Sequence, residues 1–171
     1  ATGDFICGFG FASIVETIAL QTDGKILVGG TLRSATTPGT FIPFARLNAD
    51  GSPDNFANAF SHGTGTGRSL ALQSDGKIIA AGNFEVGDPA TSADIARLNA
   101  DGTLDATYQV GTGTLTPRGQ GGGGDVSAVA LQSNGKAVIG GSFDYFGNAP
   151  VDSFVQINLD GRRDPAFDSG P

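Results

Sequence analysis

The 171-residue sequence contains no methionine, no tryptophan, one cysteine and one histidine. A single cysteine cannot form a disulfide within the chain, so we expect Cys7 to be a small buried residue. A single histidine excludes metal sites with several histidine ligands, and a Ser-His-Asp triad would depend on His62 alone. Because methionine is absent, we expect the chain to begin after a processing event: signal removal, trimming of an initiator methionine, or excision from a longer protein.

Charged residues are also few, and most of them are acidic. The sequence has 10 Lys and Arg residues against 17 Asp and Glu residues, which gives a net charge of -7. Without a basic cluster this balance argues against nucleic-acid binding, because phosphate contacts need lysine and arginine concentrated on one face. No apolar run approaches the length of a membrane span. Nearly all the acidic residues are Asp, which favours turns, and Glu, which favours helices, is almost absent.

One hairpin-like segment occurs three times in the sequence. ALQTDGKILVGG at 19–30 returns as ALQSDGKIIAAG at 71–82 and as ALQSNGKAVIGG at 130–141. A repeat of about 50 residues is typical of solenoids, propellers and other radial arrays. We therefore divide the chain into residues 1–13 as the tail of a preceding repeat, 14–65 as repeat 1, 66–118 as repeat 2, 119–124 as a glycine-rich connection and 125–171 as repeat 3.

Each repeat has the residue pattern of an antiparallel sheet. Asp-Gly, or Asn-Gly in repeat 3, predicts a two-residue hairpin turn in which both central residues tolerate positive φ. The strand after the turn (KILVGG, KIIAAG or KAVIGG) is continuously apolar, which indicates burial on both faces. A third strand and a closing segment follow. We therefore predict an all-β fold of three four-stranded β-propeller blades, with a threefold β-trefoil or β-prism as the alternative.

The paired motifs ALQxDGKIxxGG and xARLNxDGxxDxxF resemble the delta-60 repeat, a bacterial repeat associated with β-propellers. The resemblance extends from about Ile14 to Phe167. It departs from the pattern at Tyr108, which replaces the final Phe, and at Gln156, which replaces an arginine. The resemblance implies a secreted or cell-surface protein with many repeats, and it brings no catalytic residues with it.

Three blades do not complete a ring, because single-ring propellers have four to eight. Two blade faces would stay uncovered, with apolar surface and open strand edges that favour association. We therefore expect self-association, either within a longer propeller or between two chains that together form six blades. Other surface proteins and glycans are further candidate partners, whereas nucleic acid and membrane insertion are not expected.

The second turn of each repeat carries residues that are candidates for a metal site. Oxygen ligands at alternate positions around a glycine are typical of Ca²⁺ loops. The candidates are Asn48, Asp50, Asp54, Asn99, Asp101 and Asp105. We favour a tight turn in which Asp bonds nearby amides, because Arg162 and Arg163 occupy the same loop in repeat 3 and no Glu completes the ligand set. We therefore expect no cofactor, with Ca²⁺ as the alternative.

The remaining motif charges also have structural interpretations. The aspartate of the closing segment recurs in all three repeats, which suits a scaffold rather than a single active centre. Lys25, Lys77 and Lys136 follow the turns, and we interpret them as solvated charges at the hairpin ends. Arg46 and Arg97 are expected to bridge between blades, since arginine can bond a backbone carbonyl or an Asp in several directions.

We expect a non-catalytic structural or interaction module rather than an enzyme. The candidate contact residues are Tyr145 and Phe146, which lie in a variable insertion, and His62 in a glycine-flanked loop. Phe143 occupies a core position. The alternative is a lectin-like domain, although the lack of Trp leaves few aromatic side chains to stack on a sugar ring. Its binding surface would be formed by the variable loops 33–43, 85–94 and 143–152.

Overall fold

The computed structural model describes residues 13–34, 39–56, 60, 65–86, 92–115 and 124–167. Within these ranges every regular element is a strand, which confirms the all-β prediction, and no helix suited to crossing a membrane is found there. The strands are β1 Ile14–Leu20, β2 Ile26–Arg33, β3 Phe41–Leu47, β4 Thr66–Leu72, β5 Ile78–Val86, β6 Ser92–Leu98, β7 Thr114–Leu115, β8 Asp125–Leu131, β9 Ala137–Ser142, β10 Tyr145–Phe146, β11 Ala149–Pro150 and β12 Phe154–Ile157.

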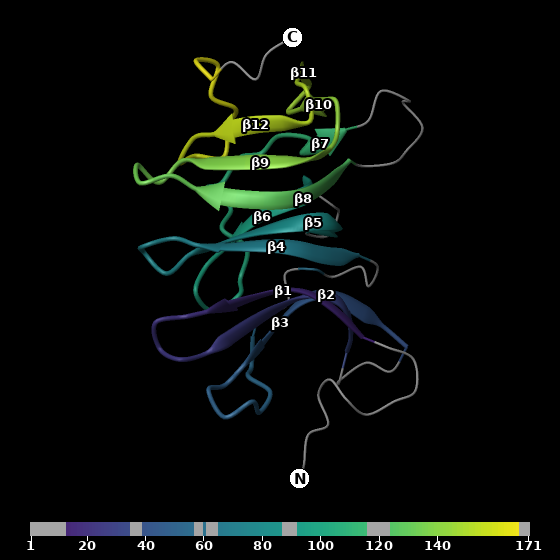
Figure 1. Cartoon of the computed structure of the whole chain (residues 1–171), viewed down its shortest axis with the longest axis vertical. Helices are drawn as coiled ribbons and strands as arrows, with labels where there is room; N and C mark the ends of the chain where they lie inside the picture. Colours follow the sequence, from purple (N-terminus) through teal and green to yellow (C-terminus); the bar gives the residue numbers. More distant parts are fainter. Residues whose placement is uncertain are drawn as a thin grey trace.

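Each repeat forms a three-stranded antiparallel sheet (Figure 1). Sheet 1 has the order β1-β2-β3, sheet 2 has β4-β5-β6 and sheet 3 has β8-β9-β12. The expected fourth strand is reduced to a closing segment that pairs with the third strand at one bridge, Leu98 with Leu104 in sheet 2. The ladder ends there because the chain turns at the next aspartate, where Tyr108 N donates to the carbonyl of Asp105.

The first hairpin of each sheet turns over three residues, so the predicted two-residue turn is wrong. In sheet 1, Gln21 N donates to Lys25 O at 2.9 Å, and Gly24 has a φ of 84°. Asp23 does not have positive φ, and its carboxylate accepts a hydrogen bond from Lys25 N at 3.1 Å. In such a loop a type I turn precedes a left-handed glycine, so one residue and not two needs positive φ.

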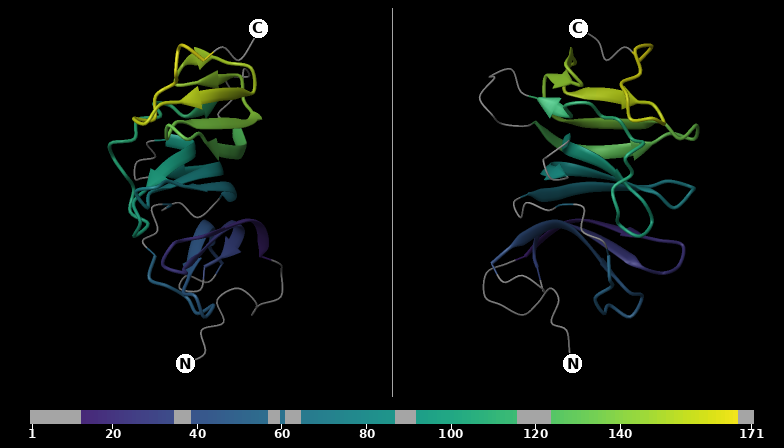
Figure 2. Two further views of the ribbon diagram at one scale, coloured as in Figure 1. Left: turned by 60° about the vertical axis from the view of Figure 1, so that its left-hand side comes forward. Right: turned by 180° about the vertical axis from the view of Figure 1, so that it is seen from behind.

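The three sheets stack face to face in chain order (Figure 1, Figure 2). The first strand of a sheet lies against the sheet before it: β4 packs against β1, β2 and β3, and β8 packs against β4, β5 and β6. We term the face that meets the preceding sheet the leading face and the opposite one the trailing face. Each internal interface therefore joins a trailing face to the leading face of the next sheet.

The packing of β5 explains why the second strand of a repeat is apolar throughout. Ile78 belongs to the core between sheets 1 and 2, and Ile79 to the core between sheets 2 and 3; they are 0% and 1% exposed. A strand between two covering layers buries both sets of alternating side chains, which confirms the interpretation from the sequence. In the first interface, the rings of Phe44, Phe60 and Phe84 pack with centroids 4.9 to 5.5 Å apart.

The second glycine of the GG pair is required by the close approach of the first strand. A Cβ at Gly141 would lie 1.9 Å from the carbonyl oxygen of Asp125, and a Cβ at Gly82 would lie 2.0 Å from that of Thr66. By contrast, a Cβ at Gly140 would meet nothing nearer than 3.7 Å. The backbone at a strand bulge therefore leaves no room for a side chain at the second position.

The insertion of repeat 3 forms the hairpin β10-β11, and β10 also pairs with β7 of repeat 2, which gives a small sheet of the order β11-β10-β7. Phe143 and Phe146 are 2% and 1% exposed and pack in the core between sheets 2 and 3. The core position predicted for Phe143 is confirmed, whereas the surface role predicted for Phe146 is wrong. Successive residues of a strand point to opposite faces, so β10 turns Phe146 inward and leaves Tyr145 37% exposed.

Candidate functional site

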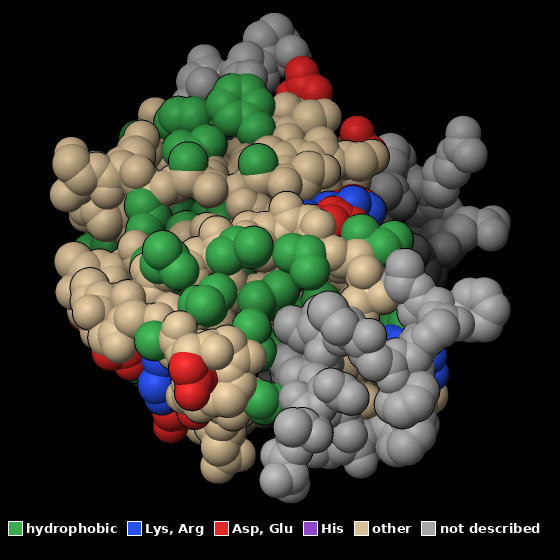
Figure 3. Space-filling view, turned by 60° about the horizontal axis from the view of Figure 1, so that its bottom comes forward, with side chains coloured by type: hydrophobic (Ala, Val, Ile, Leu, Met, Phe, Trp, Pro, Cys, Tyr) green, Lys and Arg blue, Asp and Glu red, His purple; other side chains and the backbone are tan. Residues whose placement is uncertain are grey.

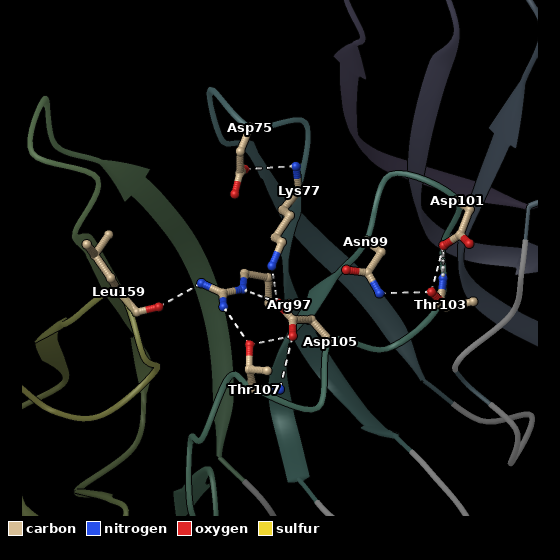
Figure 4. A network of polar contacts seen from close by, with 9 residues as sticks. All are labelled: Asp75, Lys77, Arg97, Asn99, Asp101, Thr103, Asp105, Thr107 and Leu159. Carbon is tan, nitrogen blue, oxygen red and sulfur yellow. Dashed lines mark hydrogen bonds and ion pairs between the residues drawn. The ribbon is translucent and has the colours of Figure 1, made fainter.

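In each repeat a lysine contacts the aspartate of the closing segment, and in repeats 1 and 2 an arginine contacts it as well. Figure 4 shows this arrangement in repeat 2, where Asp105 Oδ2 lies 2.7 Å from Lys77 Nζ and 2.8 Å from Arg97 Nε. Asp105 Oδ1 accepts hydrogen bonds from Thr107 N at 3.0 Å and from Thr107 Oγ1 at 2.6 Å. Lys77 follows the first hairpin and Arg97 lies on β6, so the carboxylate ties the closing segment to two parts of the sheet.

The lysines after the turns are ion-pair partners, so their interpretation as solvated charges at the hairpin ends missed the aspartate that each one contacts. Each Nζ lies 2.6 to 3.0 Å from the aspartate of its own repeat. The partners are 28 or 29 residues apart, and the sheet brings them together. The nearly constant spacing between lysine and aspartate is the sequence signal that could have identified these pairs.

Arg46 and Arg97 bridge neighbouring sheets, which confirms the prediction. Arg97 Nη1 donates to the carbonyl of Leu159 in repeat 3 at 2.7 Å, and Arg46 Nη1 donates to the carbonyl of Ala100 in repeat 2. Each guanidinium is also held by its own repeat, through the aspartate and through an aromatic ring. Arg97 Cζ lies 4.4 Å from the centroid of Tyr108. Both contacts fix the arginine in the orientation in which it donates to the next sheet.

Repeat 3 lacks this arginine. Gln156 occupies the position, and its amide donates to Gln132 Oε1 within the same sheet. Asp164 keeps its lysine partner at 2.6 Å. The ring of Phe167 packs edge-on against Phe154, with centroids 5.6 Å apart, where the other repeats place a ring against a guanidinium.

The carboxylates of the chain differ in their electrostatics. Burial alone would raise the pKa of Asp105, but hydrogen bonds from Lys77, Thr107 and Arg97 outweigh it and hold that pKa well below its usual range. Asp94 is 2% exposed, and burial raises its pKa to about 7, against a hydrogen bond from Thr114 Oγ1 at 2.6 Å. The nearby charges of Asp125 and Glu85 raise the pKa of Asp94 further. The sequence motifs did not identify Asp94.

The calcium candidates have separate hydrogen-bond partners. Asp101 Oδ1 accepts hydrogen bonds from Thr103 N at 2.9 Å and Thr103 Oγ1 at 2.6 Å, and Asn99 donates to Thr103 Oγ1 (Figure 4). Asp105 faces the two basic side chains described above. The same arrangement holds for Asn48, Asp50 and Asp54. The described residues include no group of three or more His, Cys, Asp or Glu side chains placed to hold a metal ion.

Strand β1 exposes apolar side chains at positions that later sheets cover. On the leading face of sheet 1, Ile18 and Leu20 are 62% and 69% exposed, and Val15 is 44% exposed. Leu70 and Leu72 hold the same register positions in β4 as Ile18 and Leu20 in β1, and they pack into the core between sheets 1 and 2. Figure 3 shows hydrophobic side chains gathered on the side of the molecule where sheet 1 lies.

The opposite end of the stack is open at Phe154. This side chain is 38% exposed, whereas Phe44 and Ile95, at the same register positions of sheets 1 and 2, are 2% and 0% exposed. Both ends of the stack therefore expose apolar side chains that the internal interfaces bury. These two surfaces are the candidate functional site.

The three contact residues predicted from the sequence do not form one site. Tyr145 is partly exposed, Phe146 is buried, and His62 lies outside the described residues. A cavity of about 470 Å³ lies beside the β10-β11 hairpin, and its lining includes Gln109, Phe146 and Arg162.

A comparison with protein families supports the architecture. A family model described as a domain of unknown function (DUF5122), beta-propeller, matches residues 21–56, 73–108 and 132–167. The matched segments together cover more than half of the chain, and they favour the propeller prediction over the β-trefoil or β-prism alternative. A comparison with curated proteins finds no match.

Proposed function

Because the chain belongs to the DUF5122 family of β-propeller domains, we propose that it is a non-catalytic structural and interaction module that acts by self-assembly or protein binding. We also propose that the repeats are delta-60 repeats and that the chain comes from a bacterial protein that is secreted or displayed on the cell surface. It also includes an incomplete ring, since three sheets are fewer than the four blades of the smallest single-ring propellers. A hydrolytic activity lost on His62→Ala would contradict the non-catalytic assignment.

The observation that carries the proposal is the exposed apolar strip of β1, which borders the buried β2 and β3 part of the leading face at Val28 and Ala45. In the internal interfaces, β4 and β8 are the strands that lie against the preceding sheet, and β1 is their counterpart. Its Ile18 and Leu20 are more than half exposed. Burying one such side chain contributes about 1.5–3 kcal/mol, so two or three of them favour contact with another sheet of the same kind.

The proposal is tested by the mass of the assembly over a concentration series. We expect the mass of the wild-type chain, measured by sedimentation equilibrium, to rise with concentration. Ile18→Asp and Leu20→Asp should suppress this rise, because each places a charge in the contact. Ser74→Asp, in an exposed turn, is the control and should behave as wild type. A monomer mass at every concentration, or association that ignores both β1 variants, would contradict self-assembly through this face.

Carbohydrate binding by the variable loops is the second candidate function. The cavity beside the β10-β11 hairpin and the partly exposed ring of Tyr145 favour it, while the burial of Phe146 removes one of its two expected contacts. Glycan-array binding that is lost on Tyr145→Ala would support this candidate. Absence of binding by the wild-type chain would exclude it for the glycans on the array.

A further inference from the structure

Several polar contacts cross the internal interfaces, and one of them recurs in both. In each, an arginine of the trailing face donates to a backbone carbonyl in the second turn of the next repeat: Arg46 to Ala100, and Arg97 to Leu159. The guanidinium of each arginine also forms an ion pair with an aspartate and packs on an aromatic ring, both from its own repeat. A donor fixed in this way loses little conformational entropy when the interface forms.

The leading end of the chain presents the matching acceptor. Ala49 occupies in repeat 1 the turn position of Ala100 and Leu159, and it is exposed. The turn has the same backbone geometry, with Asn48 N donating to Ser52 O at 2.8 Å. The carbonyl of Ala49 accepts no hydrogen bond from any described residue. Sheet 1 therefore offers both the apolar strip of β1 and a carbonyl acceptor.

The trailing end of the chain lacks the matching donor. Gln156 takes the place of the arginine and bonds to Gln132 of its own sheet. The supporting residues are still there, since Asp164 and Phe167 correspond to the aspartate and the ring that hold Arg97. A joint between two copies would therefore bury Phe154 against β1 without the arginine-to-carbonyl hydrogen bond.

We propose that the leading face of this chain binds the trailing face of a repeat that carries an arginine at the position of Gln156. The preferred partner is such an arginine-bearing repeat, and Gln156 makes the joint between two copies of this chain weaker than the internal interfaces. This inference rests on the proposed function, because it specifies the partner of the same β1 face.

The test is the substitution Gln156→Arg in the full chain. We expect association measured by sedimentation equilibrium to tighten about tenfold or more, the effect of one charge-assisted hydrogen bond. Gln156→Lys is the matched control and should give a smaller gain, because a lysine does not make the same planar contacts with Asp164 and Phe167. Adding Leu20→Asp to Gln156→Arg should abolish the gain. Equal association of Gln156→Arg and wild type, or an equal gain with lysine, would overturn the inference.

A second measurement tests the arginine-to-carbonyl bond between sheets 2 and 3 of the same chain. It does not depend on whether the Gln156→Arg variant folds. Arg97→Gln should raise the hydrogen-exchange rates of the β8 amides about tenfold more than Asp105→Asn does, because both variants break the ion pair and only Arg97→Gln also removes the donor to the Leu159 carbonyl. Unchanged β8 exchange would overturn the inference. The proposed function would survive that outcome as long as wild-type association still depends on Ile18 and Leu20.

Discussion

The ion-pair unit of repeat 2 should be the most sensitive polar site in the fold, and Asp105→Asn tests it. The carboxylate is 6% exposed and accepts hydrogen bonds from Lys77, Arg97 and Thr107. An amide of the same size cannot accept from all of these donors, because one of its two polar atoms is itself a donor. Arg97 is 8% exposed and would lose its counter-charge.

The expected magnitude follows from the burial of the pair. Removing one partner of a buried ion pair costs about 3–5 kcal/mol, and the partial exposure of Lys77 places Asp105→Asn near the lower end. A loss of about 3 kcal/mol lowers the melting temperature of a chain of this size by roughly 6–12 °C. Asp164→Asn should cost less, because repeat 3 has Gln156 in place of the arginine.

Unfolding followed by circular dichroism checks this prediction. Asp75→Asn is the control: the third repeat already carries Asn134 at this turn position, and both side chains accept a hydrogen bond from the following lysine amide. Its melting temperature should match that of wild type. The reasoning would be refuted if Asp105→Asn were as stable as wild type, or if Asp164→Asn lost as much stability as Asp105→Asn.

Two further predictions concern the bulge glycine and the buried acid. Gly141→Ala should lower the free energy of unfolding by about 2 kcal/mol through the clash with the Asp125 carbonyl, while Gly140→Ala should have little effect; equal losses in denaturant unfolding would contradict the packing argument. Asp94, protonated up to about pH 7 when folded, should make stability fall by at most about 4 kcal/mol as pH rises from 4 to 7. In Asp94→Asn, the free energy of unfolding measured in denaturant should no longer fall between pH 4 and pH 8. If the variant shows the same fall as wild type, other groups cause it.

The repetitive part of the fold could be predicted because its signals are local. The burial of β5 on both faces follows from a continuously apolar segment, and the sheet order follows from hairpins that the chain repeats. The predicted two-residue turn at Asp23 and Gly24 is wrong, because Asp-Gly also fits a three-residue loop in which only the glycine needs positive φ.

The polar network could be predicted only in part, because it depends on contacts across the sheet and between sheets. The bridging role of Arg97 follows from the bonding range of a guanidinium, but the pairing of Lys77 with Asp105 needs the sheet that brings them together. The position of Phe146 in an insertion predicts a surface residue, but the alternation of side chains along β10 turns it into the core.

The central claim is that the two ends of the stack are the two halves of one joint. It is tested most directly by mixing Leu20→Asp, whose leading face is blocked, with Phe154→Asp, whose trailing face is blocked. Native mass measurement should show that each variant is a monomer alone and that an equimolar mixture forms a dimer through the one pair of intact faces. A mixture that stays monomeric, or a Phe154→Asp variant that dimerises alone through two leading faces, would contradict the claim.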